Sequence, residues 1–115
     1  MYVGIVDSVP EEEVKMEGAR GARVKWLIPK EVAETFVMRM FIIARGGSIP
    51  EHTHDWEHEI YVLRGRGRIK VGDEEAELSS GMFAYIPPGV PHSYENTGSG
   101  EWVFLCIIPK KGAQR

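Results

Sequence analysis

Short runs of apolar and β-branched residues, separated by turn residues, set the pattern of this chain. The runs are TFVMRMFIIA, EIYVLRG, RIKV, MFAYIP and EWVFLCIIP. The turn residues between them include Gly46-Gly47, Gly65, Gly81 and Pro87-Pro88-Gly89. Short strands at such spacing, with turn signals between them, are typical of an all-β barrel or sandwich. We therefore expect an all-β fold with little helix.

Three local patterns add detail to this expectation. The segment RIKVGDEEAEL alternates around Gly72-Asp73, which predicts a hairpin with a two-residue loop. PKEVAET, residues 29–35, is a weak helix candidate and predicts one helical turn or a loop. The tail KKGAQR, residues 110–115, is expected to fray because chain ends are poorly ordered unless something holds them.

Two of the predicted strands are apolar at nearly every position, namely residues 36–44 and 102–108. A strand that is solvated on one face should alternate apolar and polar residues instead. Both faces of these strands are therefore expected to be buried, one inside the barrel and one against a partner. In a chain of 115 residues a homodimer is the simplest source of that second cover.

Composition and charge narrow the class of protein. The length of 115 residues suits one domain, and a net charge of −3 disfavours a nucleic-acid partner. No apolar run approaches the roughly 20 residues that span a bilayer, and the start lacks the features of a signal peptide. A single cysteine, Cys106, excludes an internal disulfide framework and favours a reducing, cytoplasmic setting.

The chemistry of the chain is concentrated in EHTHDWEHEIYVLRG, residues 51–65, which holds three of the four histidines. His52 and His54 are two residues apart, so on a strand they share a face and can bind one metal ion. The third ligand is either His58 or Glu59 on this reasoning. The remaining histidine, His92, follows a stiff turn rich in proline and glycine that would place it firmly.

The segment HDWEH, residues 54–58, also matches the H-x-x-E-H pattern of inverted zinc metallopeptidases. That chemistry requires both histidines on one face of a helix, with the glutamate beside them as the general base. Here the segment follows Gly46-Gly47 and Pro50 and leads into the strand-like IYVL. The peptidase interpretation is therefore disfavoured.

Two spaced motifs resemble those of the cupin family. The first family motif, G-x5-H-x-H-x3,4-E-x6-G, is matched at Gly46, His52, His54 and Gly65. The second, G-x5-P-x-G-x2-H-x3-N, is matched throughout, at Gly81, Pro87, Gly89, His92 and Asn96. The resemblance implies a double-stranded β-helix, a jelly-roll-like barrel of six to eight main strands. Residues 1–115 would form one such domain, with core motifs at 46–65 and 81–96 and a peripheral N-terminal strand and tail (110–115).

The family spacing also implies a choice between His58 and Glu59. Three residues separate His54 from His58, and six separate His58 from Gly65, whereas Glu59 would leave five. On a strand His58 also shares a face with Ile60 and Val62. The resemblance therefore implies four ligands: His52, His54, His58 and His92. Glu59 remains the alternative if a bulge reverses the parity.

Four neutral imidazoles would leave a bound ion its full 2+ charge, which favours anionic ligands. The expected cofactor is one divalent transition metal, with manganese or iron favoured and zinc, nickel or copper as alternatives. Tetrahedral zinc with four histidines would instead have a closed shell and a structural role.

Three residues are candidates for a substrate pocket. Arg39 interrupts an apolar run and could orient an anionic substrate, while Phe104 and Cys106 share one face of the last strong strand. The leading hypothesis is a dioxygenase-like oxidoreductase that uses dioxygen or peroxide on a small molecule. The alternatives are a non-catalytic binding protein with a metal anchor, or a non-redox isomerase or lyase of the same family.

Overall fold

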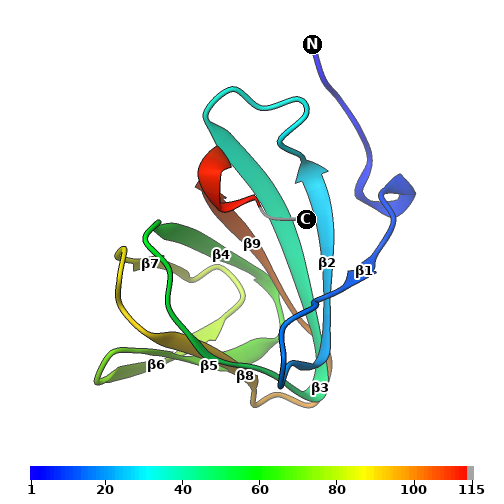
Figure 1. Cartoon of the computed structure of the whole chain (residues 1–115). Coiled ribbons are helices and arrows are strands. Elements are labelled where there is room, and N and C mark those ends of the chain that lie inside the picture. Colours follow the sequence, from blue (N-terminus) through cyan, green and yellow to red (C-terminus); the bar gives the residue numbers. More distant parts are fainter. Residues whose placement is uncertain (114–115) are drawn as a thin grey trace.

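The chain folds into an almost closed barrel of β-strands, and the computed structural model describes residues 1–113 (Figure 1). In chain order the elements are η1 (Val6–Ser8), β1 (Glu12–Glu13), β2 (Arg20–Ile28), β3 (Phe36–His52), β4 (His58–Arg64), β5 (Arg66–Val71), β6 (Glu74–Ser79), β7 (Phe83–Ile86), β8 (His92–Asn96), β9 (Trp102–Pro109) and η2 (Lys110–Gly112). The strands pair in the order β6-β5-β8-β3-β9-β4-β7, and β2 pairs with both β3 and β1. The expected all-β cupin barrel of six to eight main strands is confirmed, since only β1 is shorter than four residues.

The long strand β3 changes its partner halfway along. Residues 36–43 pair with β9, whereas Ser48, Ile49 and His52 pair with β8. The change occurs at Gly46-Gly47, where Gly46 has a φ of 76° and a Cβ on Gly47 would lie 2.7 Å from the carbonyl oxygen of Arg20. A glycine pair that reads as a turn in the sequence is thus a bend inside a strand. The bend directs His52 into the barrel mouth.

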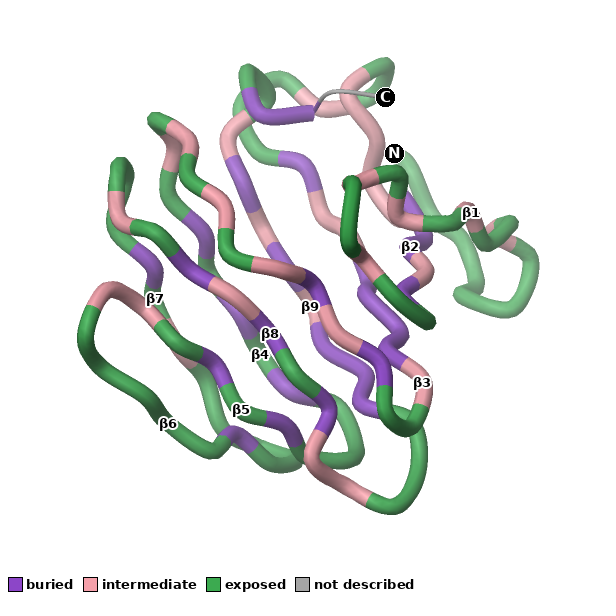
Figure 2. The backbone as a smooth tube through the Cα atoms, turned by 60° about the horizontal axis from the view of Figure 1, so that its bottom comes forward, coloured by how far each residue is buried: buried purple, intermediate pink, exposed green. Residues whose placement is uncertain are grey.

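The inner face of the barrel holds the main core, whose fully buried members include Val37, Ile43, Trp102 and Phe104. Strand β4 alternates as its sequence predicts, with His58, Ile60 and Val62 buried and the residues between them exposed. Figure 2 shows the buried positions gathered along β3 and β9, while β6 is exposed for most of its length. The two-residue loop predicted at Gly72-Asp73 joins β5 to β6.

The outer face of the same sheet carries a second apolar cluster, formed by Met40, Ile42 and Val103 with Leu27 and Leu105. Strands β3 and β9 are therefore apolar and largely buried on both faces, as their sequences predict. The chain itself, rather than the expected partner, buries Met40, Ile42 and Val103. On β2 the ammonium group of Lys25 donates a hydrogen bond to the carbonyl oxygen of Val6 at 2.9 Å, which ties the N-terminal segment to this strand.

Residues 29–35 form a loop with one hydrogen-bonded turn at Pro29, as predicted. The tail differs from expectation: it was expected to fray, but it is docked as far as Ala113, which is 4% exposed. A Cβ on Gly112 would lie 2.6 Å from the indole of Trp56, so close packing holds this end. Residues 114–115 lie outside the described part. Within residues 1–113, no helix has the length and apolarity needed to cross a membrane.

Candidate metal centre

The four histidines reach the barrel mouth from three strands, β3, β4 and β8, and from the loop that follows β3. His52 ends β3 and pairs in register with His92, the first residue of β8. His54 lies in the loop after β3, and His58 begins β4. The ring of His92 lies 4.2 Å from that of His52, 4.9 Å from that of His54 and 5.0 Å from that of His58. The cluster thus joins residues 40 positions apart in the sequence.

Every imidazole turns its Nδ1 atom away from the cluster towards a polar atom. Carbonyl oxygens accept from three of them: that of Pro50 from His52 (2.8 Å), that of Trp56 from His54 (3.1 Å) and that of Val90 from His92 (2.9 Å). Nδ1 of the fourth, His58, is hydrogen-bonded to the Cys106 sulfur at 3.0 Å, and the tautomer of His58 decides which of the two donates. Since a carbonyl can only accept, the three carbonyl bonds place the proton of His52, His54 and His92 on Nδ1 and leave their Nε2 with a lone pair.

The Nε2 side of the rings is suited to a metal ion. Ring nitrogens of His52, His54 and His92 lie within 4.8 Å of one another, and Nε2 of His58 lies 2.7 Å from Nε2 of His54. Because Nε2 of His54 carries a lone pair, this short contact requires either a proton on Nε2 of His58 or a cation beside the two rings. His92 Nε2 is also buried without a hydrogen-bond partner, which is costly for a polar atom. The residues present therefore fit a divalent ion with imidazole ligands.

Burial keeps these histidines neutral. It is the largest cause that lowers the pKa of all four, to about 2 for His58 and about 4 for His92. The positive charge of Arg39 lowers each of these pKa values further. Neutral imidazoles bind a metal without first losing a proton, so the cluster is ready for binding near pH 7.

The alternative ligand Glu59 lies on the opposite side of β4. It is exposed, pairs in register with Tyr85, and lines two cavities on the outside of the barrel. No bulge between His54 and β4 reverses the parity, so His58 faces the cluster. The helical context of the H-x-x-E-H motif is absent as well, since residues 54–58 form a loop and the start of a strand.

A cavity of about 140 Å³ opens beside the histidines. Its lining includes His52, His54 and His58, together with Arg39, Phe41 and Tyr94. Trp56 forms another wall and stacks flat on His54, with ring centroids 4.2 Å apart and planes 2° from parallel. The chamber is thus mostly apolar, with one cation and the imidazoles as its charged or strongly polar groups.

Of the three expected pocket residues, only Arg39 lines this chamber. Phe104 lies behind it as core, stacked on Phe41 and Tyr94 with centroids 5.5 and 5.4 Å away. Cys106 also lies behind the wall, where its sulfur accepts a hydrogen bond from Arg39 Nη2 and is hydrogen-bonded to His58 Nδ1, each at 3.0 Å. Burial raises the pKa of the Cys106 thiol, so it stays protonated as a hydrogen-bonding partner of its neighbours rather than acting as a nucleophile.

Sequence reasoning missed several residues of the chamber. Tyr94 could have been found, because it lies two residues after His92 and therefore on the same strand face. Trp56 lines the chamber and also contacts Gly112. Val14 and Met16 had no signal, since they come from an N-terminal segment outside both motifs.

The chain is similar to several known proteins. The sequence profile of the family described as a cupin domain matches residues 39–108. The oxalate-binding protein of Thermotoga maritima is 30% identical over 113 residues, which cover 94% of this chain and 93% of that protein. The quercetin 2,3-dioxygenase of Bacillus subtilis is 31% identical over 98 residues, which cover 76% of this chain and 29% of that enzyme.

Similarity in three dimensions extends well beyond the two motifs. The polyketide cyclase RemF from Streptomyces resistomycificus superposes with a TM-score of 0.90 at 33% sequence identity. The match covers 96% of this chain and 80% of that chain. Barrel topology, motif spacing and the profile match agree, and the chain belongs to the cupin family.

Proposed function

We propose that this protein is a metal-dependent enzyme of the cupin type that acts on a small molecule, and that it is a dioxygenase-like oxidoreductase. The metal ligands in this proposal are His52, His54, His58 and His92. One observation carries it: Nδ1 of His52, His54 and His92 is bonded to a carbonyl oxygen outside the cluster, and the buried Nε2 of His92 has no partner.

A divalent transition metal held by these nitrogens would supply a Lewis acid and, as manganese or iron, a redox centre for dioxygen or peroxide chemistry. The chain's own residues prepare the site for such chemistry. Phe41, Ile49 and Trp56 give the chamber apolar walls. Burial raises the pKa of Tyr94 well above its usual value, so the phenol stays protonated as a hydrogen-bond donor.

The similarity to quercetin 2,3-dioxygenase supports an oxidoreductase. A second candidate is a binding protein in which the metal anchors a small anion without turnover. The similarity to an oxalate-binding protein over 94% of this chain favours that candidate. The similarity to a polyketide cyclase leaves a non-redox enzyme, such as an isomerase or lyase, as a further form of the first.

Metal content and dioxygen uptake separate these candidates. The protein is purified without added metals, analysed for bound metal, and then reloaded with manganese, iron, zinc, nickel or copper in turn. Dioxygen consumption is followed with quercetin as the probe, and oxalate binding is measured by calorimetry. Uptake with manganese or iron supports the oxidoreductase. Zinc as the sole native metal, with no uptake for any ion, contradicts it, and oxalate binding without turnover supports the binding protein.

A pair of variants tests the ligand set. His58→Ala should cut metal retention at least tenfold, because it removes one of four donors. Glu59→Gln is the matched control, since it alters the adjacent residue on the outer face of the strand and should leave retention unchanged. The opposite result would show that Glu59 is the ligand.

The proposal includes a homodimer through the outer face of the barrel sheet. Exposed apolar side chains continue there from the buried Met40 cluster, and Phe83 and Phe36 are 79% and 67% exposed. Two shallow cavities on that face are lined by Met38, Ile107 and the aromatic residues of β4 and β7. A second copy would cover a surface that is costly to leave in water.

Light scattering on a sizing column tests this arrangement. Phe83→Glu should shift a dimer to a monomer, while Lys70→Glu, an exposed change on β5, should not. A wild-type monomer at micromolar concentration would contradict the proposed dimer.

A further inference from the structure

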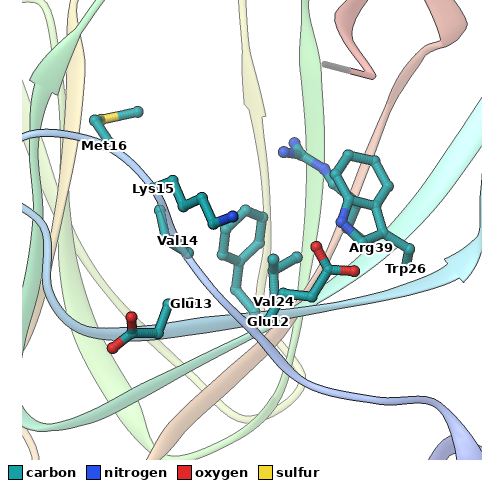
Figure 3. A pocket seen from close by; sticks show the side chains of 9 residues that line it. Glu12, Glu13, Val14, Lys15, Met16, Val24, Trp26 and Arg39 are labelled. Carbon is teal, nitrogen blue, oxygen red and sulfur yellow. The ribbon is translucent and has the colours of Figure 1, made fainter. Parts of the chain in front are cut away.

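The chamber beside the histidines adjoins a second and larger cavity. This outer cavity measures about 310 Å³ and lies between the N-terminal segment and strands β2 and β3 (Figure 3). Val14, Met16, Arg39 and Phe41 line both cavities, so the two meet at these residues. Ligand pockets commonly measure roughly 300 to 1,000 Å³. The inner chamber alone falls below that range, so a ligand of more than a few atoms would extend into the outer cavity.

Arg39 lies where the two cavities meet. Its guanidinium lies 4.8 Å from the ring centroid of Phe41 and 5.7 Å from that of Trp26. Figure 3 shows Arg39 and Trp26 side by side at one wall of the outer cavity. The aromatic contacts hold the guanidinium in a fixed orientation while leaving its charge uncompensated.

The hydrogen-bonding groups of Arg39 are only partly used. Nη2 donates to the neutral Cys106 sulfur, and Nε is buried without a partner. None of the salt bridges that the structure describes within residues 1–113 involves Arg39. A half-buried guanidinium with unused donors is stabilised by a planar oxyanion, because a carboxylate can accept two of its N–H groups at once.

The outer cavity differs from this junction in its chemistry. Val14, Met16, Val24 and Trp26 give it an apolar lining, and its polar members are Glu12, Glu13 and Lys15. The two carboxylates disfavour a second negative charge in this part. A suitable ligand therefore has a single anionic group at Arg39 and an uncharged apolar body beyond it.

We propose that the double cavity binds a monocarboxylate with an apolar body: the carboxylate pairs with Arg39, and the body fills the outer cavity under residues 12–16. The proposal rests on the proposed function, because it makes this anion the small molecule held beside the metal centre. It names Arg39 as the residue that selects the anion, and residues 12–16 with Trp26 as those that select the body.

Calorimetry on the metal-loaded full chain tests the proposal with three probes: phenylacetate, its neutral isostere phenylacetamide, and acetate, which lacks the body. Phenylacetate should bind at least tenfold more tightly than either of the others. Arg39→Met should remove that advantage, while Arg39→Lys should retain part of it. Arg45→Met is the matched control, since Arg45 is an exposed arginine on the same strand, and it should behave as wild type.

The outer cavity is tested separately by Val14→Trp, which narrows it where it meets the inner chamber. This change should weaken phenylacetate binding at least fivefold and leave acetate binding unchanged. Equal binding of phenylacetate and phenylacetamide, or full phenylacetate affinity in Arg39→Met at unchanged metal content, would overturn the proposal.

Metal content and dioxygen uptake are measured on the same samples. A wild-type protein that holds no metal and takes up no dioxygen would contradict the proposed function alone. The same calorimetry on the metal-free protein would still report the effect of Arg39 on anion binding.

Discussion

Strand β8 carries two buried polar side chains on the same face, Asn96 and His92, and they differ in how fully their hydrogen-bonding atoms are paired. At one end Asn96, 5% exposed, donates to the carbonyl oxygens of Ile43 and Gly100 and accepts from the backbone N–H of Gly98, each at 2.8 Å. At the other end His92, 1% exposed, uses Nδ1 but leaves Nε2 without a partner. Both residues belong to one sequence motif, yet only the first is complete without a ligand.

The comparison separates stabilising polar groups from groups that await a ligand. Trp102 also has a buried nitrogen without a partner, at the end of the barrel where Asn96 lies. Its Nε1 is an N–H donor, however, and cannot bind a cation. The lone pair of His92 Nε2 suits a metal ion, and the Arg39 N–H suits an anion. Whether an unpaired buried atom is a donor or carries a lone pair therefore indicates which kind of ligand it can bind.

The largest effect is expected at His92, whose Nε2 atom has no hydrogen-bond partner. His92→Ala should lower metal retention by on the order of 100-fold or more, because it removes a donor held in place by Val90. The free energy of unfolding of the metal-free protein should change by less than about 1 kcal/mol, since losing an unpaired buried nitrogen offsets the lost packing. Metal analysis after dialysis and urea unfolding measure the two effects. Retained metal would show that the unpaired nitrogen is not a ligand.

A change of pH tests the same end of the barrel without mutation. In the metal-free protein the folded-state pKa of His58 is about 2 and that of His92 about 4, both below the ordinary value near 6.5. Between pH 6.5 and about 4 the unfolded chain therefore binds protons that the folded chain does not, and stability falls as pH falls. From pH 7 to pH 5 the loss should be about 2 kcal/mol for each of these two histidines. Urea unfolding at the two pH values measures it, and His92→Ala should reduce the total loss by about 2 kcal/mol.

The next largest effect is expected at Asn96, whose hydrogen bonds are complete without a ligand. Asn96→Ala leaves the carbonyl oxygens of Ile43 and Gly100 and the backbone N–H of Gly98 without this partner and should destabilise the fold by about 2 to 4 kcal/mol. Metal retention by the folded protein should stay within about twofold of wild type, because the change lies at the other end of β8. Asn96→Asp keeps the acceptor for Gly98 but places a carboxylate oxygen against the two carbonyl oxygens, so it should not reduce the loss. A loss of metal at full stability would contradict the separation of the two ends.

The sequence predicted these features unevenly, for physical reasons. Alternation along β4 and motif spacing placed His58 on the inner face, because side-chain direction on a strand is a local property. The bend at Gly46-Gly47 was read as a turn, since a glycine pair has the same local signal inside a strand. Residues 12–16, which cover the double cavity, and the docked tail are placed by contacts between segments that are remote in the sequence. No local pattern in Val14, Met16 or Gly112 indicates which surface each will cover.

The smallest effect is expected at Gly89, and a second glycine, Gly67, provides the contrast. Gly89 has a φ of 76°, no atom within 4 Å of an added Cβ, and an N–H that donates to the carbonyl oxygen of His54 at 2.8 Å. Gly89→Ala should therefore cost only about 1 kcal/mol of backbone strain. Gly67→Ala is the informative contrast, because its Cβ would lie 2.2 Å from the Trp102 ring. Urea unfolding should show a clearly larger loss for Gly67→Ala. Equal losses would mean that the Trp102 ring moves aside at little cost, so that tighter packing does not distinguish this end of the barrel from the metal end.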